Sequence, residues 1–388
     1  MFRNILLGVL ALLVLIAIAV FAFLPGYLEA QTNVVEAHDP YVISPEAQAL
    51  HETLVIGDLH SDTLLWHRDV LARGSRGHVD LPRLQEGNVA LQLFTAVTKS
   101  PDGQNYDENT GDTDRLTQLV MVQRWPARTW GSLYERAAYQ AQRLRRAVNR
   151  SDSGLRLVLT RRDLAETIAA RVGGERVTAA LLGTEGSHAL EGDLGNVQGL
   201  HDEGYRTMGL HHFFDNELGG SLHGITDEGL NDFGRAAVQE MMRLGVIIDV
   251  AHSSEATVDD VLGMIDRPVI VSHTGVYGAC ESARNISDDH MVRIAGAGGL
   301  IGIGYWEGAI CDNSPAGIVR SIRYAIDLVG VEHVALGSDY DGATTVTLDT
   351  SELAVLTQTM LDEGFTEHEI RSVMGGNAVQ FFLENLPE

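Results

Sequence analysis

Short apolar runs recur along the chain and predict strands that are buried on both faces. Runs of four to eight aliphatic residues without polar alternation are typical of parallel sheets. Segments with helical periodicity separate the runs. The eight runs begin at Leu54, Val89, Ala180, Tyr205, Val246, Val269, Leu300 and Val334. This alternation predicts one α/β domain, a (β/α)8 TIM barrel.

The polar residues that end these runs carry the candidate chemistry. The C-terminal ends of barrel strands are where such folds keep their active sites. His60 and Asp62 are two residues apart, so both side chains point to the same side of an extended strand end. The runs end in His60 and Asp62, Glu185, His252, His273 and Asp339. The first five of these residues offer nitrogen and oxygen ligands from four strands and predict a site for two metal ions.

The ligand types indicate which metal the site holds. Imidazole and carboxylate ligands without thiolate favour zinc, for which manganese or cobalt could substitute. Glu185 can bridge two Zn²⁺ ions, with His60 and Asp62 on one ion and His252 and His273 on the other. Asp339 would then face the reacting water. For Asp341 the simpler interpretation is a loop-capping residue.

The predicted helices define where the domain begins, and one polar loop between them could cover the site as a lid. Ser44 and Pro45 form an N-cap and first-turn pair, so the fold is expected to begin at residue 44. Further helices are predicted over residues 132–148, from Arg161, from Phe233 and over residues 316–329. Residues 99–114 are rich in Gly, Asp and Asn and predict an exposed loop over the C-terminal face of the barrel.

The N-terminal segment predicts a membrane anchor. Residues 5–24 carry no charge, and about 20 apolar residues suffice to cross a bilayer. The run is longer than the core of a signal peptide and lacks its small-residue cleavage site, so an uncleaved anchor is favoured over a cleaved signal. Arg3 before the span and Glu29 after it place the catalytic domain on the periplasmic or extracellular side. The expected organisation is an anchor over 1–30, a linker over 31–43 and the barrel over 44–388.

The net charge limits which partners the protein can bind, and the cysteine content indicates whether a disulfide can form. With 53 acidic against 28 basic residues the net charge is −25, which excludes a nucleic-acid backbone as partner. The two cysteines, Cys280 and Cys311, form no Cys-x-x-Cys motif. In an exported domain a structural disulfide between them is favoured over two buried thiols.

Together these stretches resemble the membrane dipeptidase family, also called renal dipeptidases, across residues 46–385. The similar stretches are 58–62, 80–84, 185–188, 252–254, 272–273, 284–285, 337–342 and 375–377. The resemblance implies a zinc-dependent dipeptidase in which Glu185 bridges the two ions. His212, with His211 as the fallback, would contact the reacting carbonyl, Arg284 and Asn285 would bind substrate, and Asp339 would move protons. It also implies a homodimer.

Several alternatives stay open in the sequence. The same barrel could hydrolyse another amide, a β-lactam or a lactone, although the only lysine, Lys99, follows the second strand and not the fourth, where related hydrolases carry a carboxylated lysine. A metal-dependent binding protein without catalysis is the alternative from another class. Arg284 could instead form a surface ion pair. His188 could contact the Glu185 carboxylate and orient it, without binding metal itself. Residues 99–130 match no family motif, which leaves the substrate preference open.

Overall fold

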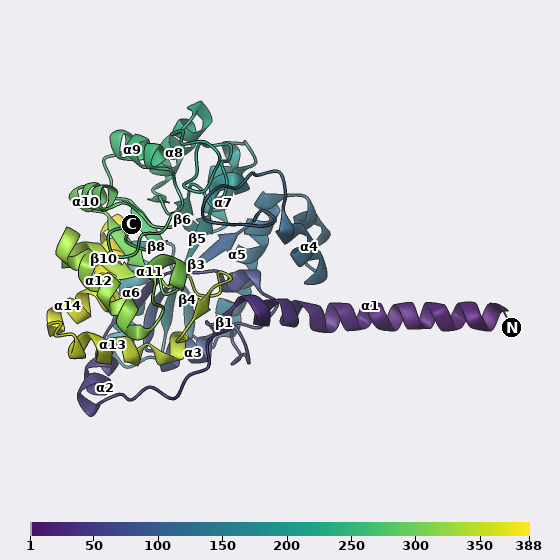
Figure 1. Cartoon of the computed structure of the whole chain (residues 1–388), viewed down its shortest axis with the longest axis horizontal. Helices are drawn as coiled ribbons and strands as arrows, with labels where there is room; N and C mark the ends of the chain where they lie inside the picture. The colour runs from purple at the N-terminus through teal and green to yellow at the C-terminus, as the bar shows by residue number, and fades with distance from the viewer. Residues whose placement is uncertain (1) are drawn as a thin grey trace.

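Eight parallel strands close into a barrel in the computed structural model, which describes residues 2–388 (Figure 1). Each strand pairs with the next along the chain, and the last returns to the first through Leu336 and Asp58. The strands are β2 (Ile56–Ser61), β3 (Val89–Val97), β5 (Thr178–Glu185), β6 (Tyr205–Gly209), β7 (Ile247–Asp249), β8 (Ile270–Thr274), β9 (Leu300–Ile303) and β10 (Val334–Leu336). The predicted (β/α)8 barrel is confirmed. A further strand, β4 (Leu155–Leu157), pairs with the beginning of β5.

The barrel strands are buried along their whole length, as their largely apolar sequences predict. Every residue of β3 and β5 is buried. Helices surround the barrel (Figure 1). They are α2 (Pro45–Glu52), α3 (Leu81–Glu86), α4 (Arg115–Val122), α5 (Leu133–Arg150), α6 (Arg161–Val172), α7 (Gly195–Asp202), α8 (Asp232–Leu244), α9 (Glu255–Met264), α10 (Asp288–Gly296), α11 (Glu307–Ile310), α12 (Pro315–Val329), α13 (Ala354–Asp362), α14 (Glu367–Arg371) and α15 (Asn377–Asn385).

Local capping sets the beginning of the predicted helices. The Ser44 side chain accepts a hydrogen bond from the Ala47 backbone N–H, and Pro45 occupies the first turn of α2. Ser132 caps α5 in the same way through the Glu135 N–H. Such caps satisfy backbone donors that lack a partner within the helix, which is why the helices begin where the Ser residues stand.

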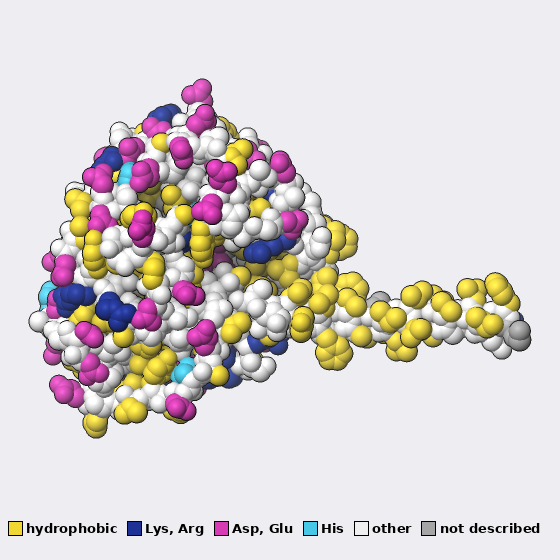
Figure 2. All heavy atoms as spheres, in the orientation of Figure 1, with side chains coloured by type: hydrophobic (Ala, Val, Ile, Leu, Met, Phe, Trp, Pro, Cys, Tyr) yellow, Lys and Arg dark blue, Asp and Glu magenta, His cyan; other side chains and the backbone are white. Residues whose placement is uncertain are grey.

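Helix α1 (Phe2–Thr32) projects from the barrel as an exposed apolar rod (Figure 2). It is long and apolar enough to cross a membrane, which agrees with the predicted anchor by length and composition. Acidic side chains are spread over the visible face of the barrel, whereas apolar side chains cover the rod (Figure 2).

The chain after the rod is not the detached tether that its polar sequence suggested. Helix α1 continues to Thr32, and strand β1 (Val34–Val35) then pairs in parallel with β11 (Thr345–Val346) beside the barrel. Asn33 is buried beside this contact, where its Oδ1 atom accepts a hydrogen bond from the Ala343 N–H, whereas residues 36–40 are exposed. The beginning of the expected linker therefore docks on the barrel, which a sequence pattern does not reveal.

Candidate active site

Three histidines and one carboxylate from different strands converge at the C-terminal end of the barrel. His60 ends β2, His273 lies in β8, and His252 follows β7. Their Nε2 atoms lie 3.6, 3.4 and 3.3 Å, respectively, from Oε1 of Glu185, the last residue of β5. All four side chains are buried. The structure thus brings together the residues that the strand ends predicted.

Two aspartates complete the cluster on the His60 side. The His60 Nε2 atom lies 3.7 Å from Oδ1 of Asp62 and 3.9 Å from Oδ1 of Asp339. These separations are too long for hydrogen bonds, and His60 Nε2 is buried without a hydrogen-bond partner among the described residues. Atoms that share a zinc ion at about 2.0–2.1 Å lie about 3.3 Å apart in tetrahedral geometry. The donor types and the spacing therefore fit metal ions.

Hydrogen bonds behind the cluster aim the ring nitrogens into it. Ser272 Oγ lies 3.0 Å from both His60 Nδ1 and His273 Nδ1. Thr95 donates to Asp62 Oδ1 at 2.8 Å. Partners of this kind fix the tautomer and ring orientation of metal-binding histidines, so that Nε2 is the atom left for a ligand bond.

Two of the site residues have left-handed backbone conformations. His252 has φ of 60° and Asp339 has φ of 58°. For a residue other than glycine this region costs about 1–2 kcal/mol and persists only where the surroundings hold it. The loops after β7 and β10 are therefore strained turns that the surrounding structure must hold, and these turns carry the two side chains to the cluster.

The electrostatics of the cluster favour bound cations. Burial, with Asp62 and Asp339 nearby, raises the pKa of Glu185 well above its usual range. Burial, together with Asp62, raises the pKa of Asp339 to about 7, although His60 and Arg284 oppose the shift. Burial lowers the pKa of His252 and of His273 well below the usual value. His252 and His273 are therefore neutral, as metal ligands must be, and the burial and crowding that raise the pKa of Glu185 and Asp339 are what a bound cation would relieve.

His212 faces the cluster, whereas its neighbour His211 does not. His212 Nε2 lies 3.5 Å from Oε2 of Glu185, and His212 lines the cavity at the site. His211 instead places Nδ1 3.2 Å from Ser253 Oγ. Of the two histidines considered from the sequence, His212 is the one that the fold turns toward Glu185.

Arg284 is buried in the site and does not form the surface ion pair considered as an alternative. It is 1% exposed, and its guanidinium lies 5.2 Å from the ring centroid of Trp306. Its Nη2 atom lies 3.2 Å from His252 Nε2 and donates to the His273 carbonyl at 3.2 Å. The guanidinium therefore stands directly beside the expected metal ligands.

Two other sequence expectations differ from the structure. Asn285 does not line the cavity, because its amide nitrogen donates to the carbonyls of Cys280 and Ala309 at 2.7 and 2.8 Å. It holds the loop that carries Arg284, and a disulfide between Cys280 and Cys311 ties the same loop down. His188 packs near Phe214 and makes no hydrogen bond to Glu185 among the described residues, so it does not support that carboxylate.

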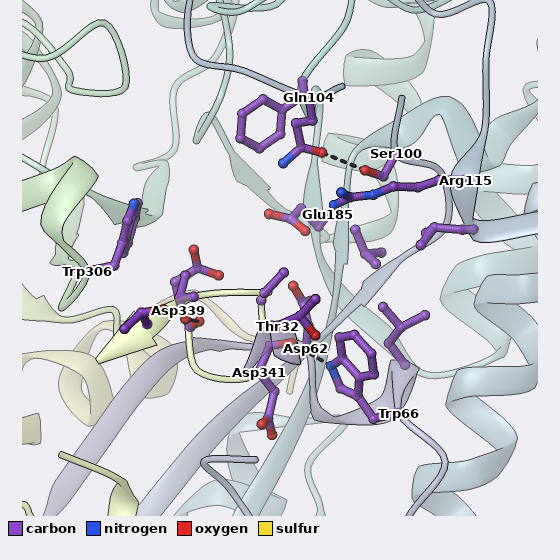
Figure 3. A pocket seen from close by; sticks show the side chains of 18 of the residues that line it. Thr32, Asp62, Trp66, Ser100, Gln104, Arg115, Glu185, Trp306, Asp339 and Asp341 are labelled. Carbon is purple, nitrogen blue, oxygen red and sulfur yellow. Dashed lines mark hydrogen bonds between the residues drawn. The ribbon is translucent and has the colours of Figure 1, made fainter. Parts of the chain in front are cut away.

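A cavity of about 840 Å³ opens over the cluster (Figure 3). Arg115 and Gln104 lie across it from Trp306 and Asp339, with Glu185 between them (Figure 3). The glycine-rich loop over residues 99–114 contributes Ser100, Gln104 and Tyr106 to the walls, as its expected place over the barrel end predicted.

The sequence reasoning missed other walls of this cavity. Leu24 and Leu28 of α1 line it, together with Leu116 and Leu119 of α4. No motif marks these residues. The helical spacing of the apolar residues in 115–122 was a signal for α4 that could have been used.

The fold and the cluster define a metal-dependent hydrolase of the barrel type. The chain belongs to the membrane dipeptidase family, Peptidase family M19, which matches residues 44–385. It is therefore a metallo-dipeptidase, a hydrolase that acts on peptide bonds.

Solved structures show the same fold. The chain is similar to dipeptidase AC, a metallo peptidase of family M19, with 25% identity and a TM-score of 0.72 over 86% of this chain and 99% of that one. A metallo peptidase from Rhodobacter sphaeroides, solved with a phosphinate mimic of the dipeptide L-Ala-D-Ala, has 24% identity and a TM-score of 0.71 over 86% and 99%. The probable dipeptidase PvdM from Pseudomonas aeruginosa has 18% identity and a TM-score of 0.73 over 88% and 98%.

Proposed function

We propose that the chain hydrolyses dipeptides with a water activated between two zinc ions. His60, Asp62 and Glu185 would hold one ion, and Glu185, His252 and His273 the other. The observation that carries the proposal is the approach of three imidazole Nε2 atoms to within 3.3–3.6 Å of Glu185 Oε1. Bound here, two zinc ions would supply a water with a pKa lowered toward about 7 and a Lewis acid for the carbonyl.

Asp339 is the proton carrier in this proposal. Its carboxylate lines the cavity, and burial raises its pKa to about 7. A carboxyl group with this pKa can both accept and release a proton near neutral pH. A carboxylate of this kind accepts the proton of the attacking water and returns it to the leaving amine. Its Oδ1 atom lies 3.9 Å from Nε2 of His60, which supports this role because the proposed water would lie beside the same histidine.

His212 stabilises the negative charge that develops on the carbonyl oxygen. The Lys99 carbonyl accepts a hydrogen bond from His212 Nδ1 at 3.2 Å, and burial lowers the pKa of His212 well below its usual value. With Nδ1 bonded to that carbonyl, the ring presents Nε2 to the site, 3.5 Å from Glu185 Oε2. A proton on Nε2 would let His212 donate a hydrogen bond to the developing oxyanion.

Arg284 restricts the substrate to dipeptides by binding the C-terminal carboxylate. A guanidinium presents a planar fork that matches a carboxylate. Arg284 lines the cavity next to His252, so a carboxylate bound to it would lie close to the proposed metal ligands. A longer peptide would have to place an internal peptide group against this charge.

The apolar part of α1 would hold the enzyme in a membrane, with the barrel on the periplasmic or extracellular side. The exposed residues of the rod and the disulfide between Cys280 and Cys311 support an anchored domain in an oxidising compartment. A homodimer is part of the proposal on family grounds alone.

The test is hydrolysis of L,L- and L,D-dipeptides by the full chain in detergent. We expect cleavage that a chelator abolishes and added zinc restores. Matched tripeptides should be cleaved at least tenfold more slowly. A metal-loaded enzyme that cleaves β-lactams or lactones but no dipeptide would overturn the proposal.

A further inference from the structure

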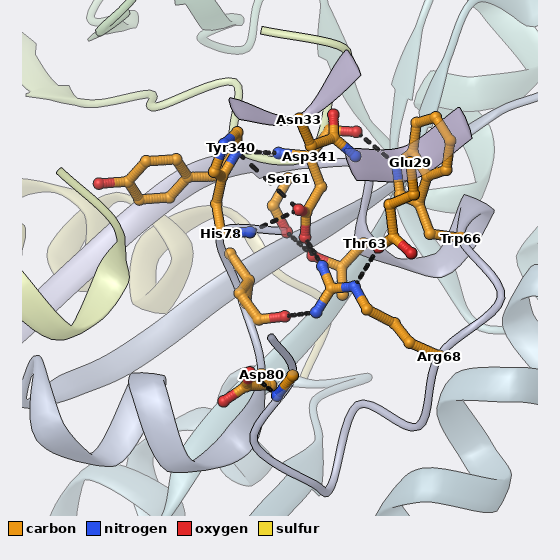
Figure 4. A network of polar contacts seen from close by, with 12 residues as sticks. Glu29, Asn33, Ser61, Thr63, Trp66, Arg68, His78, Asp80, Tyr340 and Asp341 are labelled. Atoms are coloured by element: carbon orange, nitrogen blue, oxygen red, sulfur yellow. Dashed lines mark hydrogen bonds and ion pairs between the residues drawn. The ribbon is translucent and has the colours of Figure 1, made fainter. Parts of the chain in front are cut away.

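The end of the anchor helix is joined to the barrel by a buried ion-pair network (Figure 4). Glu29 is 0% exposed, although residues 2–16 and 18–23 of the same helix are exposed. Its Oε1 atom accepts a hydrogen bond from Arg68 Nε at 2.6 Å, and its Oε2 atom accepts one from Arg76 Nε at 2.7 Å. A carboxylate buried to this degree requires such partners, so this contact defines one position of the helix on the barrel.

Arg68 connects this carboxylate to the loop after β10. Its Nη2 atom donates to Asp341 Oδ2, and its Nη1 atom donates to the Val79 carbonyl. Asp341 Oδ1 accepts a further hydrogen bond from the His78 backbone N–H at 2.7 Å. Arg68 thus stands between two buried carboxylates, one from the anchor helix and one from the catalytic loop.

The loop held in this way is the strained segment that carries Asp339. Asp339, Asp341 and Ala343 all have left-handed backbone conformations, with φ of 58°, 63° and 63°. Three such residues within five positions make this an unfavourable backbone conformation. The loop therefore keeps this conformation only if contacts outside it hold it.

The residues that follow the helix supply those outside contacts as well. Asn33 Oδ1 accepts from the Ala343 N–H at 2.9 Å, and the Val34 N–H donates to the Thr344 carbonyl at 3.1 Å. Thr344 Oγ1 in turn donates to the Asp339 carbonyl at 2.9 Å. Side-chain and backbone contacts from residues 29–34 therefore act on the same short loop.

We infer that the juxtamembrane segment, residues 24–36, is a working part of the active site, in which Glu29 acts through Arg68 and Asp341 to position Asp339. The segment also supplies Leu24, Leu28 and Thr32 to the wall of the catalytic cavity. Glu29 is a positioning residue, since it does not reach the reacting atoms. The inference rests on the proposed role of Asp339.

This contact holds the active site close to the membrane. Glu29 lies six residues after Phe23, which corresponds to about 9 Å along a helix. The active-site cavity is thus held next to the membrane-facing end of the barrel and does not swing on a tether. A form of the protein that begins at residue 31 would lack Glu29 and leave Arg68 and Arg76 without their shared carboxylate.

The experiment compares Glu29→Gln with the full-length wild-type chain in detergent. Asp39→Asn, which removes an exposed carboxylate ten residues further on, is the matched control. The first readout is amide hydrogen exchange of the metal-free protein over residues 339–346. We expect exchange at least tenfold faster in Glu29→Gln and unchanged in Asp39→Asn.

The second readout is turnover of the zinc-loaded protein. We expect kcat at least tenfold lower in Glu29→Gln, with KM within about twofold and zinc content unchanged. Unchanged exchange in a folded variant contradicts the inference, and so does a kcat loss that only follows lost zinc. If Glu29→Gln does not fold, Arg76→Gln removes the partially exposed partner and should shift both readouts in the same direction. A wild-type protein that cleaves no dipeptide would contradict the proposed function, whereas the exchange result would still decide the coupling.

Discussion

The Nε2 atoms of His252 and His273 lie 2.9 Å apart in the buried site. Burial lowers the pKa of both imidazoles, and both nitrogens also lie within 3.4 Å of Glu185 Oε1. The Ser272 hydroxyl occupies the other ring nitrogen of His273. A pair of neutral nitrogens pointing at one carboxylate oxygen is the arrangement that a shared cation produces, and the predictions below depend on it.

Asp339→Asn should abolish most turnover and leave the metal in place. The amide cannot carry the proton between water and amine, and general acid–base groups usually contribute about 10²–10⁴ in rate. We therefore expect kcat to fall by about that factor with zinc content unchanged. Asp327→Asn, on the exposed side of α12, is the matched control. Loss of zinc in Asp339→Asn would instead identify Asp339 as a ligand.

Arg284→Lys should weaken recognition of the substrate carboxylate. A lysine keeps the charge but loses the planar fork, and hydrogen bonds to charged groups contribute about 1.5–3 kcal/mol. We expect kcat/KM for dipeptides to fall about 10–100-fold. C-terminally amidated dipeptides, which lack the carboxylate, should be affected far less. Equal losses on both substrates would show that Arg284 acts on the metal ligands it contacts and not on substrate.

Removing the disulfide should destabilise the loop that carries Arg284. The bridge closes a loop with a sequence separation of 31 residues, for which chain entropy gives about 3–4 kcal/mol. We expect the Cys280→Ser, Cys311→Ser double variant to lose stability of that order in urea unfolding. Its KM should rise more than its kcat falls, because the bridge and Asn285 hold the substrate-binding side of the site. An unchanged KM would show that the disulfide does not contribute to substrate binding.

Acid should destabilise the protein through buried neutral histidines, and His51 isolates the effect away from the active site. Burial lowers the pKa of His51 to about 4, while its Nδ1 lies 2.9 Å from Thr357 Oγ1. The unfolded chain, with a histidine pKa of about 6.5, binds more protons between these values. The contribution of His51, about 3 kcal/mol, is therefore complete above pH 6.5 and is lost as pH falls toward 4.

The measurement is the free energy of unfolding in urea at several pH values from 4 to 7.5. His51→Asn should flatten the dependence on pH between 4 and 6.5. His368→Gln, an exposed histidine on α14, should leave the slope unchanged. A slope in His51→Asn equal to that of the wild type would show that His51 is not buried in its neutral form.

The barrel and the centre of the site were predictable because each depends on a local pattern. Short and largely apolar runs marked the eight strands, and the polar residues after five of them marked the end of the barrel that holds the site. His60, Glu185 and His273 follow directly from that rule, since strand direction alone places them.

The rest of the site depends on contacts between distant segments. No local pattern shows that Glu29 pairs with Arg68. None shows that the Asn285 side-chain amide donates to the carbonyls of Cys280 and Ala309. The left-handed conformation of Asp339 is equally hidden, because a loop sequence does not state which of its residues bears strain. Within the predicted linker, the pairing of Val34 and Val35 with Thr345 and Val346 is hidden for the same reason.

The most direct test of the account is the number of zinc ions that full activity requires. Metal-free full-length protein is titrated with zinc while bound metal and dipeptide hydrolysis are measured together, and His273→Asn is titrated alongside. We predict that activity rises until two zinc ions are bound per chain and that His273→Asn binds about one and stays inactive. Full activity at one zinc per chain, or activity without any bound metal, would contradict a site built on the Glu185 bridge.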